Sequence, residues 1–542
     1  MSPARDGRQG GAGRGGADRG GDQRGGGDQR GSGDQRGSGD QRGSGGRRNA
    51  QGRQRPERVH GGQQRSAQRP SERGRTSDPQ RLTAYTVMRA VAAGAYANLE
   101  LPRELRDKQI RGRDAAFTTE LVYGAIRMHG LYDPVIAVAA GRPVTKIDAN
   151  VLDTLRLGAH QLLGMRVPTH AAVDETVALA RKVNGAGAAG FVNAVMRRIS
   201  ERDLDGWLAE VVPSEGDLVA RLAVEQSHPE WVVRALRAAL LGHAAATAAT
   251  VDAQLTALVT ADNAAAKVSL VARPGLASVE ELVESGAEVS PLSPVGAVLP
   301  GGDPGGVTAV REGRAAVQDE GSQLVALALA AVPVEADGPE RWLDLCAGPG
   351  GKAGLLAALA LQAGADLTAN EVSEHRTELV RQTLRPALLQ AGHLGRSIEV
   401  RTGDGRLVGA DEPRRYQRVL VDAPCTGLGA LRRRPEARWR RTPADLADLG
   451  ALQRELLASA IDATAPGGVV AYATCSPHLA ETQFVVRDVT KRRDDVELLD
   501  ARPFLLDASG QPVAVPGTGP TVQLWPHLHG TDGMFVALLR KS

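Results

Sequence analysis

The C-terminal part of the sequence alternates apolar runs, glycine-rich turns and helical patterns. The stretch RWLDLCAGPGGKAGLLAALA (341–360) has the pattern of a buried strand, a glycine turn and a helix. Further strand candidates are DLTANE, SIEVRT, RVLVDAP and GGVVAYAT. Repeated βαβ units favour a doubly wound, largely parallel sheet. We therefore predict an α/β domain of Rossmann type at 335–542, which FVALLRKS (535–542) closes as an antiparallel edge strand.

Two other blocks precede this domain. At 79–205, stretches such as LTAYTVMRAV and VLDTLRLGAHQLL repeat apolar residues every three or four positions, which predicts an all-α domain of five to seven helices. At 215–330 the pattern is mixed. HPEWVVRALRAAL and SVEELVESG are helical there, whereas KVSLVARP, AEVSPL and AAVQDE are typical of short strands. We expect this block to be a small α/β module that links the two larger domains.

Residues 1–78 have a different composition from the rest. They contain 17 arginines against 9 acidic residues, no Leu or Ile, and a GDQRGS repeat with a period of six. So little apolar surface cannot offset the entropy lost on ordering, which predicts a disordered tail. Residues 79–542 carry 49 basic and 54 acidic side chains, so the net positive charge belongs to the tail. An Arg/Gly-rich tail suits RNA phosphates, and a merely solubilising role is the alternative.

Composition also bears on location and on metal binding. No apolar run approaches the roughly 18 residues that a membrane span needs, and the N-terminus is too polar for a secretory signal. We expect a cytoplasmic protein without a membrane partner. The three cysteines, Cys346, Cys425 and Cys475, are too few for a disulfide framework, and no CxxC or HxxxH pair suggests a metal site. A lone cysteine is most often a small buried hydrophobe, but each of these stands beside a turn motif.

The glycine turn DLCAGPGGK (344–352) carries the first functional signal. Glycines between a parallel strand and a helix let a ligand approach the backbone. Ala353 stands where a triphosphate-binding loop has Ser or Thr, which disfavours a nucleoside triphosphate. Glu371 lies 20 residues past Gly351, the usual spacing of a ribose-binding acid, and Asp404 follows the next strand. Each acid alone could be a cap or turn residue, but together they predict an adenosine-containing cofactor, with S-adenosylmethionine as the leading candidate.

Two more strands end in reactive side chains. Asp422 and Cys425 follow one strand in VDAPCTGLG, and Cys475 follows the next in YATCSPH. Because ligands bind at the carboxyl ends of parallel strands, we expect the carboxylate and both thiols to converge in one crevice. A cysteine nucleophile reacts as the thiolate, and the arginines at 432–434, 438, 440 and 441 are expected to supply positive potential. The candidate cofactor-binding residues are Cys346, Ala347, Gly348, Pro349, Gly350, Gly351, Lys352, Glu371, Asp404 and Asp422.

The motifs DLCAGPGGK, DAPCTGLG and ATCSP, in this order, resemble the RNA 5-cytosine methyltransferases of the Sun/Fmu, or RsmB-like, type. HAAVDETVALAR and FVNAVMRRI are similar to a NusB-type RNA-binding domain, and the ending LWPHLHGTDGMFVALL is similar to the C-terminus of the family. The resemblance covers nearly all of 79–542. The sequence departs from the family pattern at Glu371, where Asp is common, and at Gly348, where Ala is common.

The resemblance implies a role for each reactive residue. Cys475 would be the nucleophile that adds to carbon 6 of cytosine, and Cys425 would assist release of the covalent adduct. Asp422 would bind the amino and ring-nitrogen edge of the base as charge develops there. Cys346 would pack beside S-adenosylmethionine without reacting.

The implied activity is methylation of carbon 5 of cytosine in RNA, with small-subunit (16S) ribosomal RNA as the expected substrate and a monomer as the expected state. The same reaction on transfer RNA is an alternative. A DNA methyltransferase is disfavoured, because those enzymes use the Pro-Cys thiol and do not need ATCSP. An RNA-binding or antitermination factor with an inactive transferase domain is a reading from another class, and the intact Asp422, Cys425 and Cys475 argue against it.

Deleting residues 1–78 should weaken RNA binding at low salt and reduce the slope of log affinity against log salt, because the 17 arginines meet phosphates and release counterions. The turnover rate at saturating RNA should hardly change, since every catalytic motif lies at or after Asp344. Filter binding across a salt series measures both quantities. Equal affinity and an equal salt slope for the full and truncated chains would show that the tail plays no part in RNA binding.

Overall fold

The computed structural model describes residues 78–214, 216–335 and 338–542. The tail predicted at 1–78 lies outside the described residues except for Asp78, whose side chain accepts the Gln80 amide N–H at the start of the first helix. Within the described part of the chain, none of the helices combines the length and the apolar character that crossing a bilayer requires.

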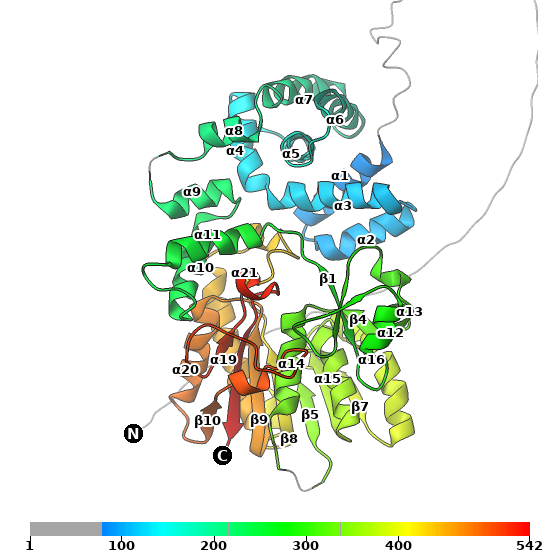
Figure 1. Cartoon of the computed structure of the whole chain (residues 1–542), viewed down its shortest axis with the longest axis vertical. Helices are drawn as coiled ribbons and strands as arrows, with labels where there is room; N and C mark the ends of the chain where they lie inside the picture. The colour runs from blue at the N-terminus through cyan, green and yellow to red at the C-terminus, as the bar shows by residue number, and fades with distance from the viewer. Residues whose placement is uncertain (1–77, 215, 336–337) are drawn as a thin grey trace, which may run out of the picture. The chain divides into compact units, whose positions relative to one another are not determined.

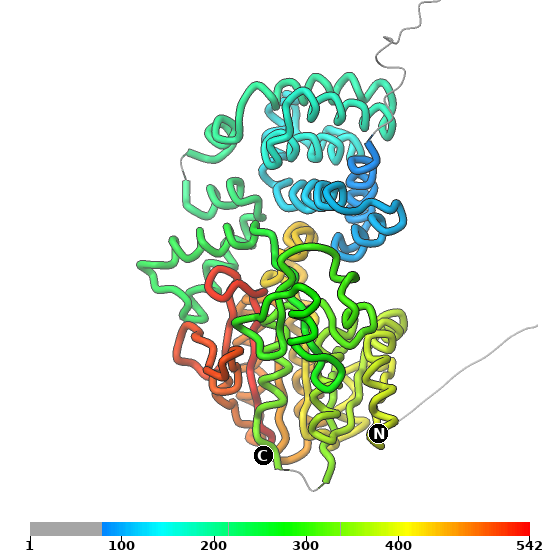
Figure 2. Tube along the Cα trace, turned by 45° about the vertical axis from the view of Figure 1, so that its right-hand side comes forward, coloured from blue at the N-terminus to red at the C-terminus, as the bar shows by residue number. Residues whose placement is uncertain are grey.

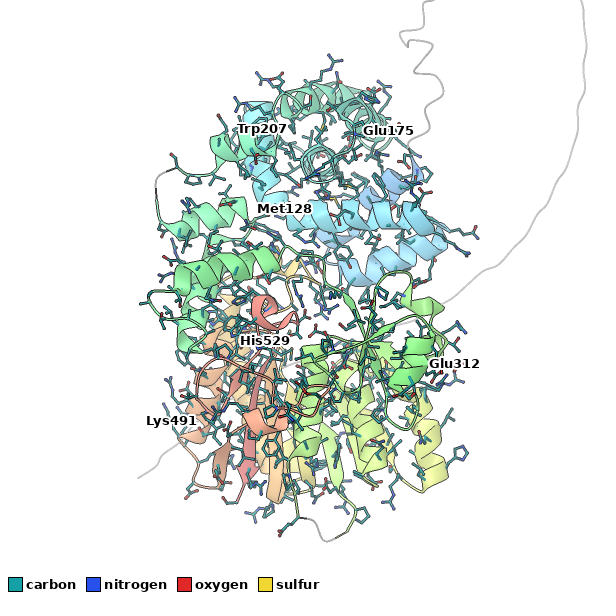
Figure 3. The ribbon with its side chains drawn as sticks, viewed as in Figure 1. Met128, Glu175, Trp207, Glu312, Lys491 and His529 are labelled. Atoms are coloured by element: carbon teal, nitrogen blue, oxygen red, sulfur yellow. The ribbon has the colours of Figure 1, made fainter. Side chains whose placement is uncertain are left out.

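The first block is helical, as predicted, with seven α-helices up to Ile199 (Figures 1 and 2). They are α1 (Pro79–Ala92), α2 (Ala97–Asp107), α3 (Gly112–Arg127), α4 (His129–Ala140), α5 (Ala149–Leu163), α6 (Thr169–Val183) and α7 (Ala186–Ile199). The apolar faces of α4 to α7 meet in a core around Leu155, Val192 and Met196, all fully buried. The helices α1, α2 and α3 pack in a second core that includes Leu121 and Leu157. Trp207 of α8 (Leu204–Val211) closes this core and donates its indole N–H to the Ile199 carbonyl at 2.9 Å (Figure 3).

The second block contains three helices followed by a small antiparallel sheet. The helices are α9 (Leu218–Glu225), α10 (Glu230–Gly242) and α11 (Val251–Ala261). The sheet has the order β2-β3-β1-β4. Its strands and two short helices are β1 (Val268–Ala272), α12 (Val279–Glu284), β2 (Glu288–Val289), β3 (Gly296–Leu299), α13 (Thr308–Arg311) and β4 (Ala315–Val317). The strands predicted at 267–274, 287–292 and 315–320 are present, whereas β3 was not predicted.

The third block is the predicted doubly wound sheet, with the order β10-β12-β9-β8-β5-β6-β7 and β11 paired to β12. The strands β9, β8, β5, β6 and β7 are parallel to one another. The strand bounds are β5 (Arg341–Asp344), β6 (Asp366–Glu371), β7 (Ile398–Thr402), β8 (Tyr416–Asp422), β9 (Thr464–Thr474), β10 (Val496–Leu499), β11 (Val522–Gln523) and β12 (Phe535–Lys541). Because β5 lies between β6 and β8, the strand order reverses there, which is where such sheets bind ligands.

Helices cover both faces of this sheet (Figure 1). They are α14 (Glu320–Ala331), α15 (Gly351–Gln362), α16 (Glu374–Leu394), α17 (Val408–Asp411), α19 (Asp445–Ala463) and α20 (Gln483–Thr490). Two short helices, α18 (Ala437–Arg440) and α21 (Pro526–His529), lie in the connecting segments. Alternate residues of one strand enter opposite cores: Leu420 packs with α14, α15 and α16, whereas Val419 and Val421 pack with α19 and α20. This alternation explains why β8 is apolar at successive positions.

The position of the last strand corrects one prediction. Residues 535–541 form an antiparallel strand, as predicted, but β12 is not an edge strand. It pairs with β9 on one side, while β10 and β11 pair with its other side. Six of its seven residues are buried, so its backbone polar groups need partners on both sides. The four-residue strand β10 was too short to stand out in the sequence.

Two loops beside the carboxyl ends of the strands approach each other through glycine. Gly533 donates its backbone N–H to the Gly429 carbonyl at 2.7 Å. A Cβ at Gly429 would lie only 2.1 Å from the Gly533 carbonyl oxygen, and that backbone atom cannot move independently. Gly429 also donates its own N–H to the Cys475 carbonyl at 2.9 Å, so this contact fixes the loop that follows β8.

Gly429→Ala should lower the free energy of unfolding by about 1–3 kcal/mol, because the added methyl group overlaps a backbone carbonyl. Gly392→Ala is the matched control. Its Cβ would meet open space on α16, where alanine is favoured by up to about 1 kcal/mol. Urea unfolding followed by tryptophan fluorescence compares the two variants. An unchanged midpoint for Gly429→Ala would mean that the loops tolerate a wider separation.

Candidate active site

The glycine turn links β5 to α15 and brings its backbone close to the neighbouring strand and helix. Ala347 donates its N–H to the Asn370 carbonyl at 2.9 Å, and Gly350 has a left-handed backbone with φ of 110°. A Cβ at Gly348 would lie 2.3 Å from a carboxylate oxygen of Glu371. At Gly351, the first residue of α15, a Cβ would meet no atom within 4 Å. The turn therefore leaves open space at the start of a helix, where N–H groups are free to bind a ligand.

Glu371 ends β6 beside this turn and is buried. Its carboxylate accepts the N–H of Gly348 at 3.0 Å and that of Ser373 at 2.9 Å, and it pairs with Arg376. A carboxylate offers about four acceptor positions, so binding both hydroxyls of a ribose requires Arg376 to leave. The Arg376 side chain is half exposed and can do so.

Asp404, the predicted adenine partner, lies two residues past β7 and is largely engaged. Arg406 binds both of its carboxylate oxygens, at 2.6–3.0 Å, and donates its backbone N–H to one of them. The side-chain hydrogen bonds from Arg406 are the main cause that lowers the pKa of Asp404. The structure places Asp404 just past the carboxyl end of β7, as predicted. Among the described residues, however, the hydrogen bonds of its carboxylate go to Arg406 alone.

Asp422 ends β8 and forms an ion pair with Lys352 of α15, with Nζ 2.8 Å from Oδ2. Burial alone would lower the pKa of Lys352, but the charge and the hydrogen bond of Asp422 outweigh it, so the pKa is raised and the lysine stays charged. Asp422 is about one-third exposed, so its second oxygen remains available to a ligand.

Asp344, the last residue of β5, was not among the predicted site residues. It is almost fully buried, and neither carboxylate oxygen has a hydrogen bond of normal geometry. Burial, followed by repulsion from Asp422, raises the pKa of Asp344 to about 7. The sequence signal for Asp344 was its position at the start of the glycine motif. An aspartate at the end of a strand does not by itself indicate that its carboxylate will lack a hydrogen-bond partner.

The carboxylates around the turn create a negative potential. Burial and then the charges of Asp344, Asp422 and Glu371 raise the pKa of the Cys346 thiol well above its ordinary value. Cys346 therefore stays a neutral thiol, and it packs against the apolar core on one face of the sheet. A ligand with ammonium and sulfonium charges would neutralise this potential and give Asp344 a partner. The residues at the turn thus fit a cationic sulfonium cofactor.

The two remaining cysteines meet as predicted. Cys425 follows β8, Cys475 follows β9, and their sulfur atoms are 3.4 Å apart as free thiols. The hydrogen bond from Cys425 lowers the pKa of Cys475, and the charges of Arg434 and Lys352 lower it further, against burial and Asp422. The pKa of Cys425 is raised well above its ordinary value, mainly by the same hydrogen bond. The pKa shifts of the two thiols therefore point in opposite directions, and the thiol with the lowered pKa lies in contact with a second sulfur.

The expected arginine cluster is mostly structural. Arg432 and Arg433 pair with Asp532, Arg438 binds the carbonyls of Ser227 and Asp262, and Arg440 binds the carbonyls of Val91 and Ala95. Arg434 is the member of the run whose charge stabilises the Cys475 thiolate, and Lys352 is the other cation that does so. The sequence could not show that Arg434, and not its neighbours, acts on Cys475. The side chains of 432–441 point toward different elements, and spacing along the chain does not reveal this.

Comparison with known proteins agrees with this geometry. Residues 331–540 match the model of the family described as 16S rRNA methyltransferase RsmB/F, and residues 78–201 match that of the NusB family. A Mycobacterium tuberculosis protein named as a methyltransferase is 51% identical over 473 residues, which cover 86% of this chain and 98% of the relative. Ribosomal RNA small subunit methyltransferase B of Pseudomonas putida is 33% identical, over 78% of this chain and 91% of its own.

A solved structure shares the fold. The crystal structure of the protein PH0851 covers 86% of this chain with a TM-score of 0.69 and 22% identity. The cofactor of the protein is S-adenosylmethionine, in agreement with the negative potential and the open backbone at the glycine turn. The chain belongs to the RsmB/F family of ribosomal RNA methyltransferases.

Proposed function

We propose that the protein methylates carbon 5 of a cytosine in RNA through a covalent adduct between Cys475 and carbon 6 of the base. The observation that carries this proposal is the contact of two thiols at the ends of neighbouring strands, with their sulfur atoms 3.4 Å apart. Carbon 5 of cytosine is a poor nucleophile, and addition of a thiolate to carbon 6 converts the ring into an enamine whose carbon 5 can attack a methyl group. S-adenosylmethionine, when bound, supplies that methyl group on a positively charged sulfur.

Each nearby side chain has a task in this scheme. The Cys475 thiolate forms the bond to carbon 6. Asp422 accepts a hydrogen bond from the amino group of the base, and a second one from the ring nitrogen once that atom gains a proton as negative charge builds up on it. Lys352 holds the Asp422 side chain in place through the 2.8 Å ion pair. After methyl transfer a base takes the proton on carbon 5, the electron pair of that C–H bond forms the double bond between carbons 5 and 6 again, and the bond to Cys475 breaks with its electron pair on sulfur. The S–H of Cys425 stabilises the departing thiolate.

We further propose 16S ribosomal RNA in the cytoplasm as the substrate of a monomeric enzyme. The helical block at 79–205 would bind RNA, the module at 215–330 would link it to the transferase domain, and that domain would span 335–542. The match of 78–201 to the NusB family and the name of the P. putida relative support this assignment. An inactive transferase is the weaker candidate. Two thiols in contact whose pKa values shift in opposite directions suit catalysis, and a protein that only binds RNA does not need them.

Cys475→Ala should abolish methylation and leave the affinity for S-adenosylmethionine nearly unchanged, because the thiol acts on the RNA. Cys425→Ala should instead accumulate an RNA–protein adduct that persists in a denaturing gel, because release is impaired. The double variant is the matched control and should form no adduct. An adduct with Cys475→Ala and none with Cys425→Ala would reverse the two roles, and bisulfite sequencing of the modified RNA identifies the methylated cytosine.

Glu371→Ala should weaken S-adenosylmethionine binding by about 10- to 100-fold, because hydrogen bonds to a charged group contribute roughly 1.5–3 kcal/mol. Glu374→Ala removes an exposed carboxylate three residues away in the first turn of α16 and should leave the affinity unchanged. Isothermal titration calorimetry gives both dissociation constants. Equal constants for Glu371→Ala and the unmodified protein would place the ribose partner at another residue.

A further inference from the structure

The loops that carry Cys425 and Cys475 share one buried carboxylate, that of Glu481. Glu481 ends a short 3-10 helix, η4 (Leu479–Glu481), and is fully buried. One of its oxygens accepts the backbone N–H of Thr426 at 2.8 Å. The other accepts the hydroxyl of Ser476 at 2.7 Å and the hydroxyl of Thr426. Thr426 directly follows Cys425, and Ser476 directly follows Cys475, so this carboxylate ties together the residues next to both thiols.

Glu481 is itself held in place from two sides. Its backbone carbonyl accepts the hydroxyl of Tyr472 on β9 at 2.7 Å. Its carboxylate accepts the side-chain N–H of Gln453 on α19 at 3.3 Å, and Gln453 also donates to the Pro424 carbonyl at 2.8 Å. The hydroxyl oxygens of Thr426 and Ser476 lie 3.1 Å apart, because both hydroxyls donate to the same carboxylate oxygen. The result is a closed network of buried polar groups around the loops that follow β8 and β9.

The charge in this network has no matching cation. Among the residues that the structure describes, no lysine, arginine or histidine forms an ion pair with Glu481, whereas the buried carboxylates of Glu371 and Asp532 each pair with an arginine. Burying a carboxylate without a counterion is costly, and a neutral residue would fill the same space more cheaply. Four donor groups converge on this side chain, which suits an acceptor-only carboxylate, and its negative charge also acts on Cys425.

The charges near the two sulfur atoms differ. For Cys425, the hydrogen bond to Cys475 and burial raise the pKa first, and the negative charges of Cys475 and Glu481 add to this effect. For Cys475, the cations Arg434 and Lys352 lower the pKa, and Asp422 is the carboxylate that opposes them. When two thiols are in contact, the first proton is lost from the pair as a whole. The fixed charges around the two sulfur atoms then decide which thiol keeps its proton.

We propose that Glu481 is a positioning residue that holds the two cysteine loops in contact and keeps the proton on Cys425, so that Cys475 alone becomes the thiolate. The proposal rests on the proposed function to the extent that these two thiols are its nucleophile and its release group. Glu481 does not touch the base or the cofactor in this role. It acts through Cys425, whose S–H is the hydrogen-bond donor to the Cys475 sulfur.

The test measures which thiol reacts in the free protein, without RNA. Both cysteines are partly exposed, so iodoacetamide can alkylate them, and peptide mass spectrometry gives the rate for each sulfur across pH 6–9. The unmodified protein should be alkylated first at Cys475. Glu481→Gln keeps the size of the side chain but removes its charge, so alkylation of Cys425 at neutral pH should rise by roughly tenfold, the effect of one pKa unit. Glu399→Gln removes an exposed carboxylate from β7 and is the matched control.

Glu481→Asp separates the charge from a purely structural role. Aspartate keeps the negative charge but is one methylene shorter, so it should preserve the preference for Cys475 while reducing kcat by about 10-fold through poorer positioning. Glu481→Gln should lose that preference, and its pH profile of kcat should change shape. If Asp and Gln give the same alkylation pattern, or if Gln retains the preference for Cys475 in protein that still binds S-adenosylmethionine, the proposal is wrong.

A second pair of variants applies if Glu481→Gln does not fold. Ser476→Ala and Thr426→Val each remove one hydroxyl donor and leave the carboxylate in the protein. Each should reduce the preference for Cys475 severalfold, because the loops lose one tie to the charge, and an unchanged preference in both would overturn the proposal. The alkylation pattern does not depend on the RNA substrate. A protein that fails to methylate cytosine but retains selective alkylation would therefore contradict the proposed function and not the role of Glu481.

Discussion

The parallel pairing of β8 with β9 is the constraint on which the rest of the site depends. Asp422 lies opposite Ala473 in this register, and just beyond it Ala423 donates its N–H to the Ala473 carbonyl at 2.9 Å. The pairing brings Cys425 and Cys475, 50 residues apart in sequence, into contact. Because alternate residues of both strands enter different cores, a one-residue slip would move each side chain of the shifted strand into the opposite core and separate the thiols. The stability of the sheet and the geometry of the site thus have the same origin.

Charge is divided unevenly across the site. The glycine turn faces Asp344, Asp422 and Glu371, a combination that holds Cys346 neutral and suits a cationic cofactor. The Cys475 sulfur faces Lys352 and Arg434 instead, and these two cations offset burial and the nearby Asp422. Lys352 belongs to both regions, because it pairs with Asp422 at 2.8 Å and is itself buried. An acidic crevice can therefore contain a thiolate, provided that the few cations lie on the thiolate side.

Most of the architecture could be predicted, because local patterns encode it. The helices at 79–199 and the strands β5 to β9 have strong periodicity and clear glycine turns, and all of them are present. The wrong predictions concern which strands and side chains lie next to each other in the folded protein. β12 was placed at the edge because the four residues of β10 gave no strand signal, and the arginines at 432–441 were treated as one cluster because spacing along a loop does not tell where each side chain points. Asp344 and Glu481 were missed for the same reason: their importance comes from what surrounds them.

The sequence by itself determined the class of chemistry. Three cysteine-bearing motifs and a glycine turn resemble those of an RNA methyltransferase family, and repeated βαβ units place the carboxyl ends of the parallel strands at one edge of the sheet. Only the tertiary structure decided the state of those groups. The 3.4 Å contact of the thiols, the unpaired carboxylate of Asp344 and the closed network around Glu481 depend on distances between elements far apart in the chain. Proton placement follows burial and nearby charge, which are properties of the folded arrangement and not of any short motif.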